Sequence, residues 1–280
     1  MTELHADCAR CAGLCCVAPG FTASADFTIS KRPGEPCPHL RGDFGCAIHE
    51  RLRPDGFAGC ATFDCFGAGQ QVTQVTFGGR DWRRQPDQAA AMFASFAVVR
   101  QLHELRWHVA AALTLTRQLT VTGVVPVTAE LTRADRALRQ HASSGPGELA
   151  ALDVETLRGT VTAALRRASE LVRGKTPAGR ELSGADLMGR DLAGADLRRA
   201  SLRGSYLIGA DLTRADLRLA DLAGADLRAA QLAGADLSSS LFLTQAQLDA
   251  ARGDATTKLV PALRRPAHWP SPGRRPGGGR

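Results

Sequence analysis

A leucine recurs at every fifth residue along much of the C-terminal half of the chain. Five residues advance an α-helix by about 500°, so these leucines would spiral around a helix instead of lining one face. In a straight β-strand the odd spacing would turn successive leucines to opposite sides. The pattern therefore predicts a short extended piece and a bend in every pentad, wound so that each leucine points to a common axis. The leucines are Leu182, Leu187, Leu192, Leu197, Leu202, Leu207, Leu212, Leu217, Leu222, Leu227, Leu232 and Leu237, with Phe242 in the next frame.

Two further positions of the pentad are nearly as regular. An alanine stands two residues before most of the leucines, and because positions two apart share a side, it joins leucine inside. The residue between them then faces outward and is most often aspartate. We interpret these aspartates as structural groups that bind turn amides, not as a row of catalytic carboxylates. They are Asp186, Asp191, Asp196, Asp211, Asp216, Asp221, Asp226 and Asp236.

The repeated Ala-Asp-Leu pattern, as in GADLAGADLRRASL, resembles the pentapeptide-repeat family over about 65 residues. The resemblance implies a right-handed quadrilateral β-helix, a solenoid with four pentads per coil. Arg190, where alanine is expected, and the pair Ser205 and Tyr206 are departures that we expect to mark an irregular first or second coil. A solenoid this short needs covers for its open ends, and we expect them in the preceding helix and in residues 243–248.

All eight cysteines lie before residue 66, and such clustering needs a local cause. In a reducing compartment it favours metal thiolates over disulfides. The spacing of Cys8 and Cys11 lets a tight turn aim two sulfurs at one ion. The neighbours Cys15 and Cys16 are expected to point to opposite sides of an extended segment and to serve different ions. The candidate metal ligands are Cys8, Cys11, Cys15, Cys16, Cys37, Cys46, Cys60 and Cys65.

The sequence leaves the identity of the metal open. Eight thiolates suit two zinc ions in tetrahedral sets of four, a binuclear cluster, or an iron–sulfur centre. His39 and His49 lie in the same segment and are alternative ligands. The segment is rich in Gly and Pro and has little apolar material, so we expect a structural metal, zinc or else iron, that folds it. A redox-active or sensing cluster is the alternative.

From Cys8 to Cys65 the chain resembles the CxxCxxCC family of zinc- or iron-chelating proteins. The matching blocks are CARCAGLCC at the start, CPHL from Cys37, GCAIHERLRP around Cys46 and CATFDC at the end. The chain departs from the family pattern by one extra residue before Cys15 and by His49, where the family tends to have tyrosine. The resemblance implies that this module chelates a metal.

The middle of the chain is predicted to be helical. Apolar residues recur every three or four positions over 86–119, as one face of a long helix requires. Thr128 and Asp153 are expected to cap two further helices, which end at Leu138 and Gly174.

The charge distribution bears on possible partners. The formal net charge is +7, but the excess lies in residues 71–177 and 242–280, and the repeat carries eight arginines against nine acidic residues. We interpret the excess of arginine as a solvated surface, because no aromatic residues are interleaved with it for base stacking, and we expect no nucleic-acid partner. Some pentapeptide-repeat proteins resemble DNA in shape and charge and bind DNA gyrase, which requires a strongly acidic surface. Because the charges of this repeat nearly cancel, such a DNA-mimic, topoisomerase-binding role is only the second alternative for function.

Neither export nor membrane insertion is expected. Residues 1–12 carry charged side chains and no apolar core, unlike a secretory signal. The longest apolar run, Ala89–Val99, has about half the length needed to span a bilayer. We expect a cytoplasmic protein.

These observations predict a protein of four parts. They are a cysteine-rich metal-binding module (1–75), a helical segment (76–177), the pentapeptide-repeat β-helix with a C-terminal cap (178–252), and a largely disordered basic tail rich in Pro, Gly and Arg (253–280). The chain has no nucleotide-binding motif and no catalytic carboxylate pair. We therefore predict a non-catalytic scaffold that binds an unidentified protein partner. A metal- or iron–sulfur-dependent redox or sensor protein is the first alternative.

Overall fold

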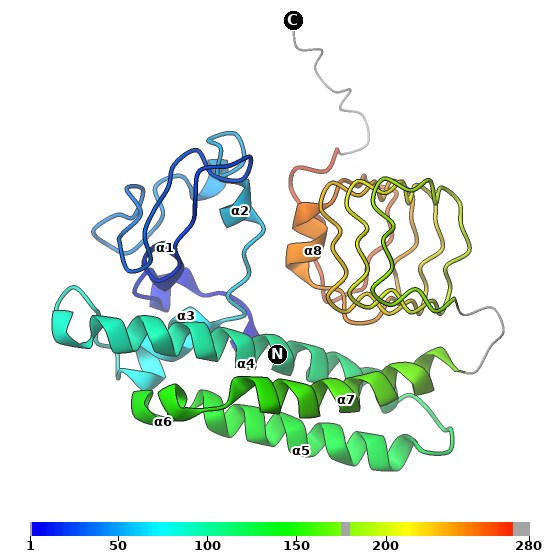
Figure 1. The fold of residues 1–280 in the computed structure, drawn as a ribbon, viewed down its shortest axis with the longest axis horizontal. Helices are drawn as coiled ribbons and strands as arrows, with labels where there is room; N and C mark the ends of the chain where they lie inside the picture. Colours follow the sequence, from blue (N-terminus) through cyan, green and yellow to red (C-terminus); the bar gives the residue numbers. More distant parts are fainter. Residues whose placement is uncertain (1, 175–179, 271–280) are drawn as a thin grey trace, which may run out of the picture. The chain divides into compact units, whose positions relative to one another are not determined.

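The computed structural model describes residues 2–174 and 180–270, and the chain divides into two compact units (Figure 1). The first unit joins Met1–Arg117 to Val125–Arg166, and the second joins Gln118–Val124 to Arg167–Arg280. The predicted division at residue 75 does not separate compact units, because the cysteine-rich segment shares the first unit with the helices. No described helix has the length and apolar character of a membrane span.

The N-terminal part of the first unit consists of short helical turns joined by loops. A small aromatic cluster holds the loops together, since Phe21 stacks on Phe27 with ring centroids 4.2 Å apart and meets Phe57 edge to face at 6.5 Å. The antiparallel bridges are isolated pairs: Phe21 with Lys31, Ser24 with Phe27, and Leu40 with Cys46. The turns are η1 (Thr2–Leu4), η2 (Cys8–Arg10), α1 (Leu14–Val17), η3 (His49–Arg51), α2 (Ala58–Ala61), α3 (Ala68–Gln71), the π-helical η4 (Val72–Thr76) and η5 (Pro86–Gln88).

The helices that follow are α4 (Ala89–Thr116), α5 (Val124–Ala142), α6 (Pro146–Ala151) and α7 (Val154–Arg173). The long helix predicted over 86–119 is confirmed as α4. Both ends of α7 are confirmed, since Asp153 Oδ1 accepts a hydrogen bond from the Thr156 amide at 3.0 Å and Gly174 follows with φ of +68°. Thr128 is not a cap, because α5 already begins at Val124 and turns Val127 into the core. The short α6 was not predicted, although a proline suits its first turn.

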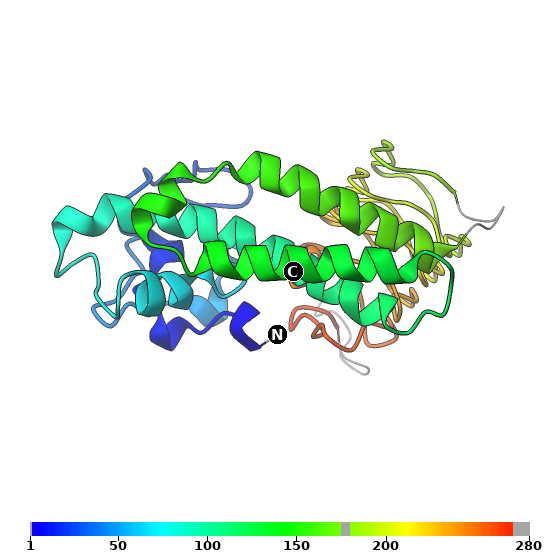
Figure 2. The same ribbon diagram turned by 90° about the horizontal axis from the view of Figure 1, so that it is seen from below.

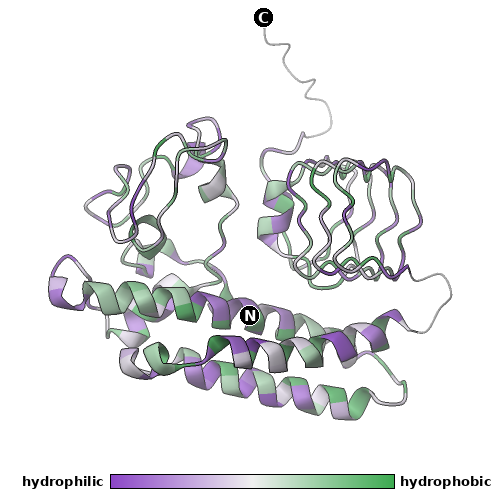
Figure 3. Ribbon diagram, viewed as in Figure 1, coloured by the Kyte–Doolittle hydropathy of each residue, from purple (hydrophilic) through white to green (hydrophobic). Residues whose placement is uncertain are grey.

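Helix α4 organises the first unit. In Figure 3 a hydrophilic stretch near the middle of α4 separates two hydrophobic stretches. The polar side chains of this stretch are partnered: buried His103 donates from Nδ1 to the Phe66 carbonyl at 2.8 Å, and buried Arg106 forms an ion pair with Glu3. Arg106 also lies 3.7 Å from Asp135 of α5, which crosses in front of α4 in Figure 2. The N-terminal segment is therefore fastened to α4 by polar contacts as well as by apolar packing.

The second unit is built from the pentad repeat, which winds into coils that are seen side on in Figure 1. Parallel bridges join residues 20 positions apart, from Glu181 with Ser201 to Asp221 with Leu241. This spacing confirms four pentads per coil. The extended pieces are so short that the described residues of the repeat form isolated bridges and no continuous sheet.

The predicted interior of the solenoid is confirmed. From Leu197 to Leu237 each leucine of the series is at most 2% exposed, and from Ala210 onward the alanines two positions before them are buried as well. In Figure 3 hydrophobic and hydrophilic residues alternate along the coils, as this arrangement requires.

The first coil is less well covered. The last turn of α7 reaches the solenoid through Arg173, whose Nε donates to the Arg199 carbonyl at 2.8 Å. The first three leucines nevertheless remain half-buried: Leu182, Leu187 and Leu192. Among the described residues, the cover predicted from the preceding helix is therefore incomplete.

The outward aspartates bind turn amides as predicted. Each of the eight accepts a hydrogen bond from the amide two residues ahead, at distances of 2.9–3.2 Å. Asp221 is an exception in its burial, because it is 0% exposed and its carboxylate lies 2.7 Å from Arg203 of the preceding coil. Asp221 thus keeps the outward position and its turn-amide bond, but neighbouring side chains cover it and Arg203 compensates its charge.

The two departures from the repeat do not interrupt the coils. Tyr206 takes the outward position and forms parallel bridges with Asp186 and Asp226. The Arg190 amide donates to the Leu187 carbonyl at 3.2 Å, as the alanine amides do in other pentads. The predicted irregularity is absent, because an arginine fits this otherwise inward position on the exposed rim of the first coil.

Helix α8 (Gln245–Ala250) closes the C-terminal end of the solenoid (Figure 1). Thr244 and Gln247 form a capping box at its start, and Gln247 Nε2 donates to the carbonyls of Leu222 and Ala225, each at 2.8 Å. Leu248 of the helix is fully buried. The predicted C-terminal cap is confirmed, and it satisfies carbonyl groups that no further coil would reach.

The chain beyond α8 remains packed on the solenoid. Lys258 forms a parallel bridge with Asp236, and Trp269, 4% exposed, donates from Nε1 to the Ala251 carbonyl at 3.1 Å. The expectation of a largely disordered tail from residue 253 is therefore wrong as far as residue 270, because a buried tryptophan anchors this segment. Residues 271–280, on which the rest of that expectation falls, lie outside the described residues.

Candidate functional site

The eight cysteines are free thiols in two adjoining neighbourhoods of the first unit. The first surrounds Cys11, whose amide donates to the Cys8 carbonyl at 3.3 Å across the turn of η2. Helix α3 packs so closely on this turn that a Cβ on Gly69 would lie 2.5 Å from Cys11 Sγ. Cys65 lies just before α3, and electrostatic interactions link the Cys11 thiol with Cys8, Cys65 and Cys15.

The second neighbourhood surrounds Cys16. Cys37 donates its amide to the Cys16 carbonyl at 2.9 Å, and its own carbonyl accepts from Leu40, which forms an antiparallel bridge with Cys46. Cys60, in α2, interacts electrostatically with Cys16, Cys37 and Cys46. These backbone contacts bring together four cysteines that are widely separated in the sequence.

The two neighbourhoods meet at Cys15 and Cys16, whose Sγ atoms are 3.9 Å apart. Both lie in α1, not in the extended segment that we expected, and adjacent helical residues diverge by about 100°. Cys15 interacts with Cys11 and Cys65 of the first neighbourhood, whereas the Cys16 thiol has a side-chain hydrogen bond with Cys46 of the second. Cys8 also interacts with Cys16 and Cys46, so the neighbourhoods are not isolated from each other.

A buried lysine lies beside the second neighbourhood. Lys31 is 6% exposed, and its Nζ donates to the carbonyls of Val17, Arg32 and Glu35 at 3.0, 3.1 and 2.7 Å. Burial lowers the pKa of Lys31, while the acidic groups around it, among them the thiols of Cys37 and Cys16, raise the pKa. A positive charge is thus fixed by three carbonyl groups next to thiols that can become negative.

The protonation of the thiols follows from their surroundings. Burial raises the pKa of the Cys11 thiol and that of the Cys60 thiol to about 11 each, and neighbouring thiolates act in the same direction. Cys16 is the exception, because the hydrogen bond from Cys15 lowers its pKa to about 7. In the absence of a bound cation, Cys11 and Cys60 are therefore protonated at neutral pH, and a metal ion would displace their protons.

The donor atoms do not converge as they are placed. Within residues 2–174 and 180–270, no three side chains of His, Cys, Asp or Glu form a group that could hold a metal ion. His39 packs edge to face on Phe57, with ring centroids 5.0 Å apart, and His49 lies in η3. The chemistry of the donor set still fits zinc, because the backbone gathers two groups of four thiols and rotation about χ1 moves each Sγ without moving the backbone.

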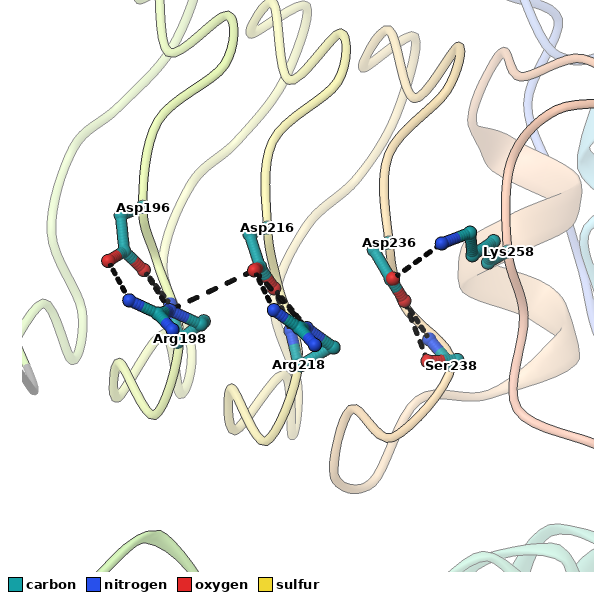
Figure 4. A network of polar contacts seen from close by, with 7 residues as sticks. All are labelled: Asp196, Arg198, Asp216, Arg218, Asp236, Ser238 and Lys258. Atoms are coloured by element: carbon teal, nitrogen blue, oxygen red, sulfur yellow. Dashed lines mark hydrogen bonds and ion pairs between the residues drawn. The ribbon is translucent and has the colours of Figure 1, made fainter.

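One face of the solenoid carries a ladder of polar contacts (Figure 4). It consists of Asp196, Arg198, Asp216, Arg218, Asp236, Ser238 and Lys258. Arg198 lies 2.7 Å from Asp196 and 3.8 Å from Asp216 of the next coil, so the contacts run both within and between coils. Hydrogen bonds from Arg198 lower the pKa of Asp196 to about 2. The carboxylates of this ladder are satisfied by turn amides and cations, which suits structural groups better than general acids or bases.

The face two pentads away from the ladder is more apolar. Met188 and Tyr206 are 52% and 51% exposed there, and Ile208 beside them is half-buried. They adjoin the half-buried leucines of the first coil. Sequence reasoning did not identify this surface, although comparing outward positions 20 residues apart would have paired Met188 with Ile208.

The sequence analysis also did not identify Lys31 as a residue of the candidate site. Its signal in the sequence is that the chain has only three lysines among 35 basic residues, so a lysine in the cysteine-rich segment stands out. Its burial depends on the loops that surround it, which no local pattern predicts.

Comparison with known proteins identifies the repeat. The family model described as pentapeptide repeats matches residues 181–218, 205–243 and 215–252, with eight copies. The uncharacterized protein YybG of Bacillus subtilis (strain 168) is 48% identical over 271 residues, which cover 95% of this chain and 95% of YybG. The relationship to YybG therefore includes the cysteine-rich and helical parts.

Two solved pentapeptide repeat proteins are each 29% identical to part of the chain. One, from the thylakoid lumen of Arabidopsis thaliana, matches with 34% of this chain and 68% of its own, at a TM-score of 0.16. The other is HetL of Nostoc sp. strain PCC 7120, which is involved in heterocyst differentiation regulation and matches with 30% of this chain and 46% of its own, at a TM-score of 0.17. Scores this low carry no argument about the fold, which rests on the 20-residue bridge spacing. By its repeat and by its relationship to YybG, this chain belongs to the pentapeptide-repeat family.

Proposed function

We propose that this protein is a non-catalytic protein-interaction scaffold, in which the solenoid offers the docking surface and a metal ion holds the cysteine-rich segment. The observation that carries the proposal is the contrast between two faces of the solenoid. The charged side chains of the ladder form ion pairs with one another. On the other face the side chains of Met188 and Tyr206 and the half-buried leucines of the first coil contact solvent. Exposed apolar side chains grouped on one surface are typical of a protein-binding site.

The composition of this surface favours a protein partner. Aromatic and methionine side chains are enriched at interfaces, because they bury a large area with few torsions to fix. Tyr206 also offers a hydroxyl group that can hydrogen-bond at the rim of an interface. We expect the partner to present an apolar patch or groove to Met188 and Tyr206.

A photo-cross-linking experiment in cells tests the docking surface. A photoreactive side chain at position 188 of the full-length chain should give one discrete protein adduct. The same group at position 218, on the ladder, is the matched control and should not give that adduct. Met188→Glu should abolish cross-linking from position 206. Identical adducts from positions 188 and 218, or no adduct from either, would contradict the proposed surface.

The metal belongs to the same proposal as a structural component. The ligands would come from the eight cysteines, and zinc suits such thiolates without supplying redox chemistry. The resemblance of residues 8–65 to metal-chelating proteins supports this assignment, and it remains a prediction. Protein purified without oxygen should be colourless and contain about two zinc ions per chain. Visible charge-transfer bands would indicate an iron–sulfur centre instead, and metal-free protein would contradict the assignment.

A redox sensor is the second candidate function. The observation that favours it is the Cys16 thiol, whose pKa is lowered to about 7 and which has a side-chain hydrogen bond with Cys46. In metal-free, reduced protein treated with diamide, a sensor should form the disulfide between Cys16 and Cys46 before any other. Mass spectrometry can assign the pairing, and an unselective mixture of disulfides would exclude the sensor role.

DNA mimicry gains no support from the described solenoid surface. Asp196, Asp216 and Asp226 lie 2.6–2.7 Å from arginines of their own pentads, which cancel their charge. A mimic has to reproduce the dense negative charge of a phosphate backbone.

A further inference from the structure

We propose that the eight cysteines form two separate metal sites, in which Cys8, Cys11, Cys15 and Cys65 hold one ion and Cys16, Cys37, Cys46 and Cys60 hold the other. The inference rests on the proposed metal-binding function and adds to it the ligands of each ion. Sequence spacing leaves this division open, since eight cysteines can be divided into two sets of four in many ways.

The first set is assembled by two turns that face each other. Cys8 begins η2 and Cys11 directly follows it; η2 packs on α3, and the close approach of Gly69 to Cys11 leaves no room for a side chain between them. The Cys65 carbonyl accepts a hydrogen bond at 2.8 Å from Ala68, the first residue of α3, so the position of Cys65 is tied to the same contact. Gly13, with φ of +66°, turns the chain between Cys11 and α1, and the Cys15 thiol of α1 interacts electrostatically with those of Cys11 and Cys65.

The second set is assembled by backbone pairing of loops. The Cys37 amide donates to the Cys16 carbonyl, and the bridge between Leu40 and Cys46 returns the chain to the same place. Cys60 enters from α2, where the amide of its neighbour Gly59 donates to the Asp26 carbonyl at 3.1 Å. These contacts gather the four backbone positions, and α1 links them to the first set through the neighbours Cys15 and Cys16.

The two sets differ in exposure and charge. Four thiolates around a divalent cation carry a net charge of about −2, which costs free energy when it is buried. The second set has the buried Lys31 beside it and contains the buried Cys37. The first set contains the exposed Cys8 and Cys15, and Asp7 interacts unfavourably with the Cys8 thiolate. We therefore expect the first site to lose its ion before the second.

Paired substitutions test the division in the full-length chain loaded with Zn²⁺. Cys11→Ser with Cys65→Ser removes two ligands from one proposed site and should lower the bound zinc from two ions to one. Cys11→Ser with Cys46→Ser removes the same number of thiols, one from each site, and should leave none tightly bound. If both pairs lose the same amount of zinc, or if the cross-set pair retains more than the within-set pair, the division is wrong.

Alkylation of the unmodified sequence gives an answer even if a variant fails to fold. As a chelator is titrated into the zinc-loaded protein, Cys8, Cys11, Cys15 and Cys65 should become reactive to N-ethylmaleimide as one group. Cys16, Cys37, Cys46 and Cys60 should follow as a second group, and peptide fragmentation distinguishes Cys15 from Cys16. Simultaneous exposure of all eight thiols would indicate one binuclear cluster and overturn the division while retaining metal binding. Protein that never binds zinc would overturn both the division and the proposed metal-binding function.

Discussion

The solenoid and the cysteine-rich segment obtain their cores in different ways. In the solenoid each leucine of the series from Leu197 to Leu237 is almost completely buried, because at least one neighbouring coil presents a leucine at the same position. The cysteine-rich segment has a few buried apolar side chains, such as Leu14, Val17 and Phe57, and no periodic pattern. Its loops depend on contacts with α4 and, as we propose, on metal ions. A repeated pattern therefore supplies its own core, whereas an irregular segment depends on partners outside itself.

The largest effect is expected from a charge placed inside the solenoid. Leu222 is 0% exposed, and Leu222→Asp would bury a carboxylate without a partner. We expect a loss of about 4 kcal/mol in the free energy of unfolding, enough to disrupt the solenoid. Asp216→Ser is the control, because serine can still accept from the turn amide, and loss of the partly exposed pair with Arg218 should cost less than about 1 kcal/mol. Equal losses of thermal stability, followed by circular dichroism, would contradict the inward and outward assignment.

Metal removal should unfold the cysteine-rich segment and leave the solenoid folded. We expect a strong chelator to make residues 2 to about 70 sensitive to protease, because their loops have little apolar core, while a fragment from about 180 to 270 survives with its circular dichroism spectrum intact. Limited proteolysis with mass spectrometry locates the cleavage sites. Because His103 and Arg106 fasten the cysteine-rich segment to α4, cleavage should also increase in α4. Simultaneous loss of the solenoid would show that its stability is not independent of the metal.

These contrasts explain what the sequence could predict. The five-residue period fixes an inside and an outside for every pentad, so the coil size implied by the family resemblance, the leucine core and the cap at residues 243–248 are all confirmed. Two helices were predictable for the same reason, since α4 and α7 have periodic apolar residues and α7 also has a side-chain cap at Asp153. Patterns that repeat at a short interval need no knowledge of distant contacts.

Contacts between distant residues account for the failures. The burial of Asp221 depends on Arg203 in the preceding coil, and the order of the tail depends on Trp269 reaching Ala251. The two thiol neighbourhoods likewise arise where loops close on one another, as when Cys37 pairs with Cys16. Counting cysteines indicated metal chemistry but did not assign any cysteine to a set.

Acid should destabilise helix α4 and the solenoid in different pH ranges. Burial lowers the pKa of His103 from its usual 6.5 to about 4, so the unfolded chain takes up the proton first. Stability from neutral His103 is complete above pH 6.5 and is lost as pH falls toward 4, by an amount on the order of 2 kcal/mol. In the solenoid, hydrogen bonds from Arg198 lower the pKa of Asp196 to about 2, so its contribution persists until the pH falls below about 4.

Hydrogen exchange of reduced, zinc-loaded protein at pH 7 and pH 4.5 measures this difference region by region, and a substitution at His103 separates its effect from the release of zinc by acid. The amides of α4 should lose protection at pH 4.5, whereas those of the solenoid should keep it. His103→Gln is the control, because glutamine can still donate to the Phe66 carbonyl but does not titrate in this range. A pH response of α4 that is unchanged by this substitution would exclude His103 as its cause.

The smallest effect concerns the turns between pentads, which form the corners of each coil. Some of these turns place a residue other than glycine in the left-handed backbone region. Gly209 and Ala229 occupy the same corner in successive coils, with φ of +65° and +57°. The left-handed region suits glycine and costs other residues about 1 kcal/mol.

A Cβ on Gly209 would meet no atom within 4 Å, so Gly209→Ala changes only the backbone preference and should lower the stability of the solenoid by about 1 kcal/mol. Ala229→Gly should raise it by less, because glycine also increases the freedom of the unfolded chain. Melting temperatures of the two variants measure these opposite shifts, and the combination measures the coupling between the two turns, since the Gly209 amide donates to the Arg228 carbonyl at 2.8 Å. At Gly69, in the cysteine-rich segment, alanine would instead meet Cys11 Sγ at 2.5 Å, so the same substitution there should be the more damaging one. If Gly209→Ala were as damaging as Gly69→Ala, packing rather than backbone conformation would limit the corners of the solenoid.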